Sequence, residues 1–406
     1  MKTKTVQFDN GNGLTLTGLI DLPPGKPVAY ALFAHCFTCT KNLKSASTIS
    51  QALTEAGIAT LRFDFTGLGQ SEGDFAATSF SSNVEDLLAA AEFLSENYEA
   101  PKILIGHSLG GTAVLQAATS VDSAIAVATI GSPARPEHVA HLLDGSREEI
   151  ERTGEAVVKL GGRDFKIRKQ FLDDLKEQDL PESIHSLRKA LLIFHSPIDS
   201  TVEIDNASEL YRHALHPKSF VSLDNADHLL SKQRDSRYVG EVLASWATRY
   251  LAEQSLIEQP RTVAGAVVAR THVDGFFTRV NANAHTLVAD EPESVPGGTN
   301  RGPSPYDLLA GALATCTSMT LKMYATLKKF PVTDFTVSVQ HSKIHAEDCK
   351  HCDSKVGKID RFDRKIAYTG ELDDKQRERL LVIADKCPVH ATLHNDIDMQ
   401  TSLEAS

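Results

Sequence analysis

One serine set among glycines, where a strand-like run meets a helix-like run, constrains this chain more than any other feature. Residues 103–105 are apolar and strand-like, Gly-His-Ser-Leu-Gly-Gly follows at 106–111, and 112–118 is rich in helix-forming residues. A serine at such a turn has a strained backbone and an exposed hydroxyl, and the glycines are needed because a Cβ would collide with the neighbouring strand and helix. The helix directs its N-terminal N–H groups toward whatever the serine attacks. The stretch therefore predicts a strand, a sharp turn and a helix that present Ser108 as a nucleophile.

The length and the charge of the chain limit what it can be. With 406 residues the chain exceeds what one hydrophobic core usually fills, so we expect two domains. Its formal net charge of -11 argues against a broad nucleic-acid or anionic-membrane surface, because such surfaces need clustered Lys and Arg. We therefore expect a small neutral or apolar substrate, no nucleic acid and no membrane partner.

The N-terminus carries lysines but no apolar segment of signal-peptide length, and no apolar run approaches the roughly 20 residues that a membrane helix needs. This pattern predicts a cytoplasmic protein. In that compartment the cysteines are expected to be reduced thiols rather than a disulfide framework. They stand at positions 36, 39, 316, 349, 352 and 387.

Strand-like and helix-like segments alternate through the first 250 or so residues. Residues 5–24 alternate apolar and polar side chains around Asn-Gly and predict a hairpin. Further strands are expected at 30–34, 58–63, 103–105, 124–130, 190–194 and 219–223, and helices at 47–56, 83–95 and 239–251. This alternation is typical of a doubly wound, mostly parallel sheet.

Residues 135–187 interrupt the alternation. They are charged and mostly helical by periodicity, with a break at the glycine pair 161–162. An insertion at this place, on the carboxyl side of the sheet, would cover the serine as a helical cap; the alternative is an ordinary crossover with a decorated surface. The glycine-rich loop at 64–73 lacks the G-x-G-x-x-G spacing and no lysine follows it, so a phosphate site is not favoured there.

An acid and a histidine each follow a predicted strand. Asp199 comes just after the strand at 190–194, and His228 comes just after the strand at 219–223. The chain order Ser108, Asp199, His228 is the order of an α/β-hydrolase triad. The strand-end position favours Asp199 over three other acids in these loops, Asp205, Asp224 and Asp227.

With these features, residues 1 to about 252 resemble an α/β-hydrolase-fold serine hydrolase close to the esterase and acyl-peptidase-like groups. The resemblance implies an oxyanion hole made by the backbone N–H groups of Leu109 and Phe37; many members carry glycine where this chain has Cys36. His228 would take the proton of the serine hydroxyl and Asp199 would orient the imidazole. We expect hydrolysis of a carboxylic ester with a small or medium acyl group through an acyl-enzyme. A non-catalytic hydrolase fold used for binding is the alternative.

The pattern changes after a polar stretch at 253–261, which we take as the linker between domains 1–252 and 262–406. In the second half, strands are expected at 264–272, 275–282, 285–292, 335–345 and 365–370, and helices at 306–329 and 373–386. Strands and helices grouped in this way predict a smaller α+β domain.

Three stretches of this second half carry a resemblance to the OsmC/Ohr-like family, over about 262–404: Gly-Pro-Ser-Pro-Tyr-Asp-Leu-Leu at 302–309, Ala-Thr-Cys-Thr-Ser-Met around Cys316, and Ala-Asp-Lys-Cys-Pro-Val-His around Cys387. The resemblance implies that a hydroperoxide oxidises Cys316 to a sulfenic acid, which condenses with Cys387 and is restored by a dithiol reductant. It also implies an intertwined homodimer. The whole chain thus resembles a bifunctional fusion of an esterase with an OsmC-like domain.

The second half departs from that family at the groups that lower the thiol pKa. Tyr306 stands where the better-studied peroxidases carry Glu, and Asp307 follows it. Three arginines are candidates for the expected guanidinium: Arg270, Arg279 and Arg301. The alternative is that this domain is a non-catalytic dimerisation or lipid-like ligand-binding module.

Two C-x-x-C motifs remain. Cys349 and Cys352, with His351 between them and His345 before them, have the spacing of half a zinc site, but the other half is missing. Cys36 and Cys39 lie in the expected oxyanion loop, where a redox or loop-packing role is favoured over metal binding. We therefore expect no metal and no cofactor.

Overall fold

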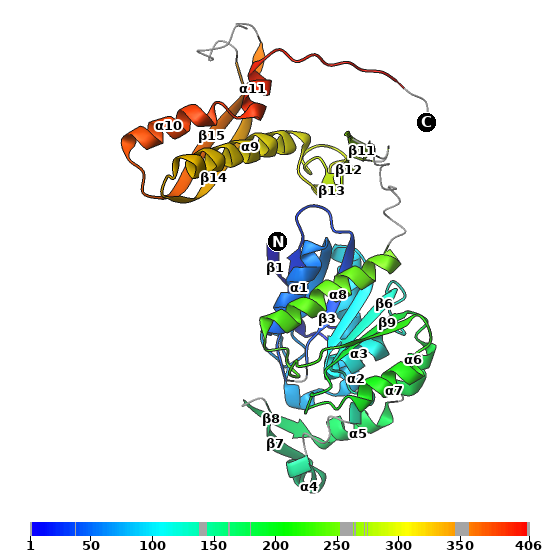
Figure 1. Ribbon diagram of the computed structural model, residues 1–406. Coiled ribbons are helices and arrows are strands. Elements are labelled where there is room, and N and C mark those ends of the chain that lie inside the picture. Colours follow the sequence, from blue (N-terminus) through cyan, green and yellow to red (C-terminus); the bar gives the residue numbers. More distant parts are fainter. Residues whose placement is uncertain are drawn as a thin grey trace. The chain divides into compact units, whose positions relative to one another are not determined.

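The computed structural model describes residues 2–36, 38–137, 144–160, 163–178, 180–251, 263, 265–271, 273, 275–345 and 357–403. The chain divides into two compact units, Met1–Leu256 and Ile257–Ser406 (Figure 1). The expected linker, 253–261, lies outside the described residues. Each unit is therefore described by itself.

In the described part of the first unit, eight strands form one sheet in the order β1-β2-β4-β3-β5-β6-β9-β10. The strands are β1 (Lys2–Asp9), β2 (Thr15–Leu22), β3 (Ala29–Ala34), β4 (Ile58–Phe63), β5 (Ile103–His107), β6 (Ala126–Ile130), β9 (Ala190–His195) and β10 (Lys218–Ser222). The β1–β2 hairpin and the β2–β4 pair are antiparallel, and all the other neighbours run parallel. The mostly parallel, doubly wound sheet expected from the sequence is confirmed.

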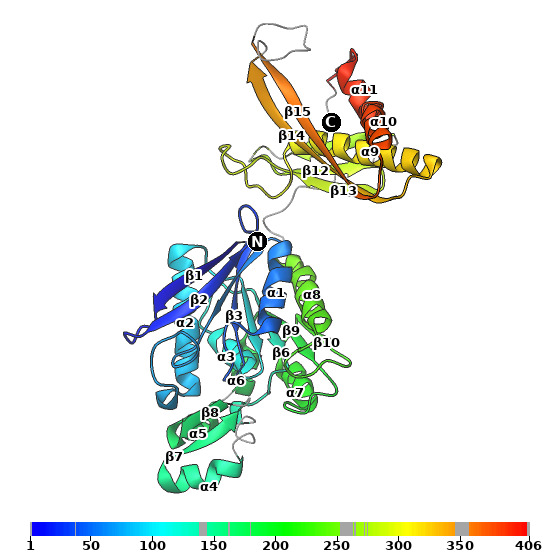
Figure 2. The same ribbon diagram turned by 90° about the vertical axis from the view of Figure 1, so that its left-hand side faces the viewer.

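Helices cover both faces of this sheet (Figure 2). One face packs against α1 (Lys44–Glu55) and α8 (Gln233–Leu251). The other packs against α2 (Phe80–Asn97), α3 (Leu109–Ala117) and α7 (Asp205–His213). Neighbouring strand residues therefore alternate between two apolar cores, with Leu32 in one and Phe33 in the other. Burial on both faces explains why the central strands β3, β5, β6 and β9 are largely apolar, whereas β1 and β10 at the sheet edges are more polar and exposed.

The insertion before β9 contains a β-hairpin as well as helices. Its elements are α4 (Asp144–Thr153), β7 (Glu155–Leu160), β8 (Arg163–Arg168), α5 (Lys169–Glu177) and α6 (Leu180–Ser186). The expectation that 135–187 is mostly helical is wrong for 155–168, where β7 and β8 pair antiparallel. Ala156 and Val158 are buried and Val157 between them is exposed, which is the period of a strand. The expected break at 161–162 lies outside the described residues.

The second unit combines long helices with separate small sheets. A three-stranded antiparallel sheet holds β11 (Val267–Thr271), β12 (Thr278–Ala282) and β13 (His285–Ala289), and β14 (Val332–His345) pairs with β15 (Lys358–Gly370). The helices are α9 (Pro305–Lys328), α10 (Asp374–Ala384) and α11 (Pro388–His394). Leu321, Leu380 and Ile383 lie in the core between α9, α10 and the long hairpin. This is the expected α+β architecture.

Two negative findings concern the described residues. None of their helices combines the length and the apolar character that crossing a membrane requires. Within the same residues, no group of three or more His, Cys, Asp or Glu side chains could hold a metal ion. Cys349, His351 and Cys352, the half zinc site, lie outside the described residues.

Candidate active site and thiol pair

Ser108 lies in a sharp turn between the last residue of β5 and the first residue of α3. Its φ of 55° is in the left-handed region, which is strained for a residue other than glycine. A Cβ on Gly106 would lie 2.2 Å from the carbonyl oxygen of Gly110, and a Cβ on Gly110 would lie 2.4 Å from that of His35. Only glycine fits at both positions. The backbone collisions that the sequence analysis anticipates are therefore present.

The structure brings Ser108, His228 and Asp199 into one hydrogen-bonded chain. His228 Nε2 lies 2.9 Å from Ser108 Oγ, and His228 Nδ1 lies 2.7 Å from Asp199 Oδ2. Ser108 follows β5, Asp199 follows β9, and His228 follows β10. Because these strands are parallel, their carboxyl ends meet at one edge of the sheet, which is where ligands bind in such folds.

The Asp199 carboxylate is held in its charged form. Its Oδ1 accepts hydrogen bonds from the backbone N–H groups of Thr201 (2.8 Å) and Val202 (3.0 Å). Burial acts to raise the pKa of this carboxyl, but the hydrogen bond and charge of His228, together with the two backbone N–H groups, outweigh burial and lower that pKa below its usual value. A charged carboxylate beside Nδ1 fixes the tautomer in which Nε2 can take a proton from Ser108.

His107, which the sequence analysis passed over, supports the loop that carries His228. Its Nε2 donates to the backbone carbonyl oxygen of His228 at 2.7 Å, and the two rings lie 5.2 Å apart. Burial, followed by the nearby His228, lowers the pKa of His107 to about 3. The side chain is therefore neutral at ordinary pH. In the sequence, the feature that could have pointed to His107 is its position directly before Ser108, at the first x of G-x-S-x-G.

Leu109, one of the two expected oxyanion donors, is the first residue of α3, where backbone N–H groups have no partner within the helix. Phe37, the other, lies outside the described residues. Its neighbours are described. Cys39 N–H donates to the Cys36 carbonyl oxygen at 3.0 Å, and Thr38 has a left-handed φ of 65°. The loop after β3 therefore makes a tight turn beside the start of α3.

Cys36 and Cys39 form a disulfide across this turn. This corrects the expectation that all the cysteines are reduced thiols. The turn brings the two Cα atoms within 5.3 Å, which is inside the range that a disulfide spans. Sequence spacing alone could not show this, because the distance between the two Cα atoms depends on how the backbone turns between them.

A buried ionic network, also missed from the sequence, anchors the far end of the same loop. Lys41 and Asp64 are almost completely buried and form an ion pair. Asp64 Oδ1 also accepts from the backbone N–H of Lys41 at 2.7 Å, while Arg62 donates to the Lys41 carbonyl oxygen. Arg62 in turn pairs with buried Asp21 at 2.9 Å. Both backbone groups of Lys41 are thus held by buried charged side chains.

The glycine-rich loop at 64–73 surrounds a carboxylate of the chain itself. Asp64 Oδ2 accepts the backbone N–H of Gln70 at 2.9 Å, and a Cβ on Gly69 would lie 2.1 Å from the same oxygen. Loops of this kind can offer N–H groups to a phosphate. Here Asp64 occupies that position, which agrees with the view that the loop is not a phosphate site.

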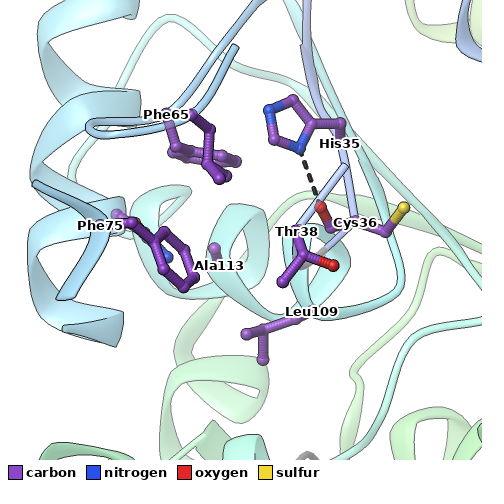
Figure 3. Close-up of a pocket in the computed structure, with 10 residues that line it drawn as sticks. His35, Cys36, Thr38, Phe65, Phe75, Leu109 and Ala113 are labelled. Carbon is purple, nitrogen blue, oxygen red and sulfur yellow. Dashed lines mark hydrogen bonds between the residues drawn. The ribbon is translucent and has the colours of Figure 1, made fainter. Parts of the chain in front are cut away.

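A small cavity lies beside the loop and the start of α3 (Figure 3). His35, Cys36 and Thr38 line one side of it, and the rings of Phe65 and Phe75 line another. The cavity has a volume of about 10 Å³, which is room for about one water molecule. His35 Nδ1 donates to the Cys36 carbonyl oxygen at 2.8 Å, as the dashed line in Figure 3 marks. The lining is mainly apolar and suits an uncharged group.

The insertion contacts this region. Arg163 of β8 donates to the backbone carbonyl oxygen of Thr38, and the ring of Phe165 lies 5.1 Å from that of Phe75. Asp174 of α5 accepts from the backbone N–H of Ser81 at 2.8 Å. The insertion therefore packs against the loop after β3 and against the start of α2, beside the candidate site. Whether it covers Ser108 as a cap remains a prediction.

In the second unit, Cys316 and Cys387 are free thiols joined by a hydrogen bond. Cys316 is half-buried in α9, and Cys387 is fully buried just before α11. Burial and the bond to Cys387 raise the pKa of Cys316. Burial also acts to raise the pKa of Cys387, but hydrogen bonds from Cys316, from the backbone at 389 and 390 and from Thr317 outweigh it and lower that pKa.

Arg364 of β15 is the arginine that reaches the surroundings of this pair. Its Nη1 donates to Thr317 Oγ1 and to the Ala384 carbonyl oxygen, both at 3.0 Å, and its Nη2 pairs with Asp385 at 2.6 Å. Arg364 is not among the predicted residues, because the sequence pattern predicts a strand that begins only at residue 365. The observed strand begins earlier, at Lys358.

Three of the residues first considered for the acid and the guanidinium, Tyr306, Asp307 and Arg301, have other contacts. The Asp307 carboxylate accepts from the backbone N–H of Ser304 at 2.9 Å and caps α9. The ring of Tyr306 stacks on that of His341 at 4.1 Å. The Arg301 guanidinium lies over the ring of Phe277, with 4.0 Å between its central carbon and the ring centre. Arg270 and Arg279 lie in β11 and β12.

Comparison with known proteins gives two family matches and several relatives. The family described as "Serine aminopeptidase, S33" matches residues 39–145, and the family described as "OsmC-like protein" matches residues 298–402. Two curated relatives are named "Palmitoyl-protein thioesterase ABHD10, mitochondrial". The one from Rattus norvegicus is 29% identical over 177 residues, which is 43% of this chain and 55% of that protein. The one from Mus musculus is 26% identical over 215 residues, 51% of this chain and 68% of that protein. The chain thus spans about half of the rat relative's length.

Solved structures resemble the first unit. The esterase domain of a Rhodothermus marinus protein is 54% identical, has a TM-score of 0.52, and is covered in full by 62% of this chain. Est1E from Butyrivibrio proteoclasticus, solved with ferulic acid bound, has a TM-score of 0.53 and is covered in full by 61% of this chain; at 20% identity it shows the fold alone. The chain therefore belongs, through its first unit, to the esterase-type α/β hydrolases, and it joins that hydrolase to an OsmC-like domain.

Proposed function

We propose that the first unit is a serine carboxylic-ester hydrolase that works through an acyl-enzyme on Ser108. The observation that carries the proposal is the hydrogen-bonded chain from Ser108 through His228 to Asp199. As Ser108 Oγ attacks the ester carbonyl carbon, His228 Nε2 takes its proton, and Asp199 stabilises the imidazolium. His228 then returns the proton to the leaving alcohol. Water attacks the acyl-enzyme by the same route in reverse.

The negative charge on the carbonyl oxygen needs preorganised donors. We assign one donor to the backbone N–H of Leu109, at the N-terminal end of α3. The resemblance to the hydrolases implies that the backbone N–H of Phe37 is the other. Removing one such donor in serine hydrolases costs about 10²- to 10³-fold in kcat. We therefore assign much of the lowering of the activation barrier to the two N–H donors, one in the turn after β3 and one at the start of α3.

The mainly apolar lining of the cavity beside Leu109 supports an uncharged substrate rather than a phosphorylated one. We propose an acyl group of small or medium size, which the series of esters below tests. The curated relatives are named as thioesterases, so thioesters, whose leaving group is a thiol, are the substrates to test beside esters, whose leaving group is an alcohol. Both reactions proceed through the same acyl-enzyme on Ser108.

The test is hydrolysis of p-nitrophenyl esters of increasing acyl length, with the matching thioesters beside them, by the full chain. Ser108→Ala is expected to abolish turnover while the fold remains intact. Ser120→Ala, at an exposed serine beyond α3, is the matched control and is expected to keep the parent rate. A fluorophosphonate probe should label the parent and the control but not Ser108→Ala. Parent-level turnover in Ser108→Ala would refute the assignment.

For the second unit we propose thiol-dependent reduction of organic hydroperoxides by Cys316 and Cys387. The hydrogen bond between the two sulfurs supports it, because sulfurs in contact can join without rearrangement of the backbone. One thiolate attacks the peroxide oxygen, releases the alcohol and becomes a sulfenic acid. The other thiol displaces water to form a disulfide, and a dithiol reductant restores both thiols.

Peroxide should consume both thiols of the parent, while Cys387→Ser should retain a sulfenic acid on Cys316 that a dimedone probe captures. Thiols that do not react with organic hydroperoxide would favour the alternative, a non-catalytic dimerisation or ligand-binding module. Measuring ester hydrolysis in the same samples keeps the two proposals separate.

We also propose that the second unit forms a homodimer. Met319, Met323 and Leu327 follow one another on α9 at helical spacing and are 65%, 69% and 75% exposed. Such a stripe is costly in water and is typical of an interface. Sedimentation of the parent should show a dimer, and Met323→Glu should shift it to monomer. A parent that sediments as a monomer at micromolar concentration would contradict the proposal.

A further inference from the structure

The loop after β3 carries a group that the proposed hydrolysis does not use, the Cys36–Cys39 disulfide. Both ends of the loop are fixed without it. At one end, His35 Nδ1 donates to the Cys36 carbonyl oxygen at 2.8 Å, and the carbonyl oxygen of His35 lies against Gly110 of α3. At the other end, the backbone of Lys41 is held by Asp64 and Arg62. Between these two anchors the disulfide is the covalent constraint.

The segment under that constraint has an unfavourable backbone. Thr38 has a φ of 65°, a conformation that costs a non-glycine residue about 1 kcal/mol or more. Two contacts hold the turn that contains it: the Cys39 N–H bond to the Cys36 carbonyl oxygen at 3.0 Å, and the bond from Arg163 to the Thr38 carbonyl oxygen. Without the covalent bond, the turn loses its strongest constraint, and these hydrogen bonds and the burial of Thr38 remain.

The two sulfurs differ in access to solvent. Cys36 is 4% exposed, whereas Cys39 is half-buried at the surface of the loop. Because Cys39 is the more exposed residue, we infer that a thiolate from solvent attacks its sulfur and that Cys36 is the leaving group.

We propose that the Cys36–Cys39 disulfide is a reducible modification site that controls ester hydrolysis at Ser108. The inference rests on the proposed function of the first unit. Breaking the bond removes the covalent constraint on the turn that contains Thr38. Cys36 and Thr38 line the same cavity as Leu109 and Gly110, directly after Ser108, so a change in the turn reaches the oxyanion side of the site. The oxidised form is the active hydrolase, and the dithiol form is slow.

The chemical step balances with a dithiol as the reductant. One thiolate of the reductant attacks Cys39 Sγ, forms a mixed disulfide and expels Cys36 as a thiolate, which takes a proton. The second thiol of the reductant then attacks its own sulfur in the mixed disulfide and expels Cys39. The protein gains two electrons and two protons, and the reductant leaves as its cyclic disulfide.

The experiment uses the full chain, incubated with excess dithiothreitol under native conditions or left oxidised. Alkylation with iodoacetamide and mass analysis of the tryptic peptide that ends at Lys41 reports the state of the pair. Hydrolysis of a p-nitrophenyl ester and the rate of fluorophosphonate labelling of Ser108 report the site. Reduction is expected to lower kcat and the labelling rate by about tenfold to hundredfold, and reoxidation with diamide should restore both.

Two variants show which motif responds. The double variant Cys36→Ser/Cys39→Ser should hydrolyse the ester at the rate of the reduced parent, and dithiothreitol should not change that rate. Circular dichroism checks that the variant is folded. Cys349→Ser/Cys352→Ser removes the other C-x-x-C and should keep the full response of the parent. A response that is lost in this second variant would overturn the assignment to Cys36 and Cys39.

The remaining outcomes separate this proposal from the one on which it rests. If the pair is alkylated after reduction and both rates stay within twofold, the control is refuted but the hydrolase stands. If the pair resists dithiothreitol in the native protein, it is not reducible and the proposal fails. If the oxidised protein neither hydrolyses esters nor reacts with the fluorophosphonate, the proposed hydrolysis fails and its control fails with it.

Discussion

The Nε2 atom of His107 lies 2.7 Å from the backbone carbonyl oxygen of His228. The residue beside the candidate nucleophile therefore holds the loop that carries the candidate base. Because burial keeps His107 neutral, with a pKa of about 3, its ring can donate this one bond and carries no charge that would repel a protonated His228. The arrangement couples two strand ends that are far apart in the sequence.

The depressed pKa of His107 predicts a loss of stability in acid. The usual pKa of 6.5 applies to the unfolded chain, so below that pH protons bind the unfolded state in preference. The stability that neutral His107 contributes to the folded state is fully present above about pH 6.5. As the pH falls toward 3, the free energy of unfolding decreases by up to about 5 kcal/mol. His107→Gln keeps an N–H donor and does not titrate. Urea unfolding at a series of pH values should show a shallower decline for His107→Gln, and parallel curves would contradict the prediction.

Asp199→Asn should lower kcat for ester hydrolysis by about 10³- to 10⁴-fold, because an amide cannot hold the His228 tautomer that accepts a proton from Ser108. The free energy of unfolding should change far less than this loss of activity implies. Asp224→Asn, at a neighbouring exposed acid, is the matched control and should retain the parent kcat. Equal losses in the two variants would remove the special role of Asp199.

Asp64→Asn should destabilise the first unit by about 3–5 kcal/mol, because it leaves the ammonium of Lys41 buried without its counter-ion. Urea unfolding measures the change. Glu55→Gln breaks the exposed ion pair with Arg237 and is the comparison, for which a much smaller loss is expected. A similar loss in both variants would show that burial of the Lys41–Asp64 pair does not decide its importance.

Thr317→Val should raise the pKa of Cys387. The Thr317 hydroxyl donates to this sulfur and favours the thiolate, so the variant loses that preference while it keeps a side chain of similar shape. The pH midpoint for alkylation of Cys387 should move upward. Thr315→Val, at an exposed threonine on the same helix that bonds the Gly311 carbonyl oxygen at 2.8 Å, should leave the midpoint in place. A midpoint unchanged in Thr317→Val would show that Thr317 does not tune Cys387.

Much of the first unit could be predicted because its central strands, β3, β5, β6 and β9, are buried on both faces. Continuous apolar runs such as 103–105 stand out from helices of mixed composition, and glycines at 106 and 110 are required by backbone contacts of 2.2 and 2.4 Å. The three candidate triad residues could be chosen because each follows a strand. Their mutual distances follow from the parallel order of β5, β9 and β10 and could not be read from spacing.

The errors arise where tertiary contacts, rather than the local sequence, determine the structure. The β7–β8 hairpin buries alternate residues against the rest of the first unit, and its short strands were mistaken for part of a charged helix. Arg364 was missed because its strand is largely exposed, so the hydrophobic pattern that marks a strand begins too late. The Cys36–Cys39 disulfide requires the loop to bring the two Cα atoms within 5.3 Å, and the turn that does so contains a threonine with a left-handed φ, which the sequence does not predict.

The hydrogen bond from Arg163 to the Thr38 carbonyl oxygen joins two segments that lie 125 residues apart in the sequence. The donor lies in β8 of the insertion, and the acceptor lies in the turn assigned to the oxyanion. Any change that separates β8 from this turn must break the bond. The insertion therefore braces the turn, so a substitution in β8 can alter reactivity at Ser108 without contacting it.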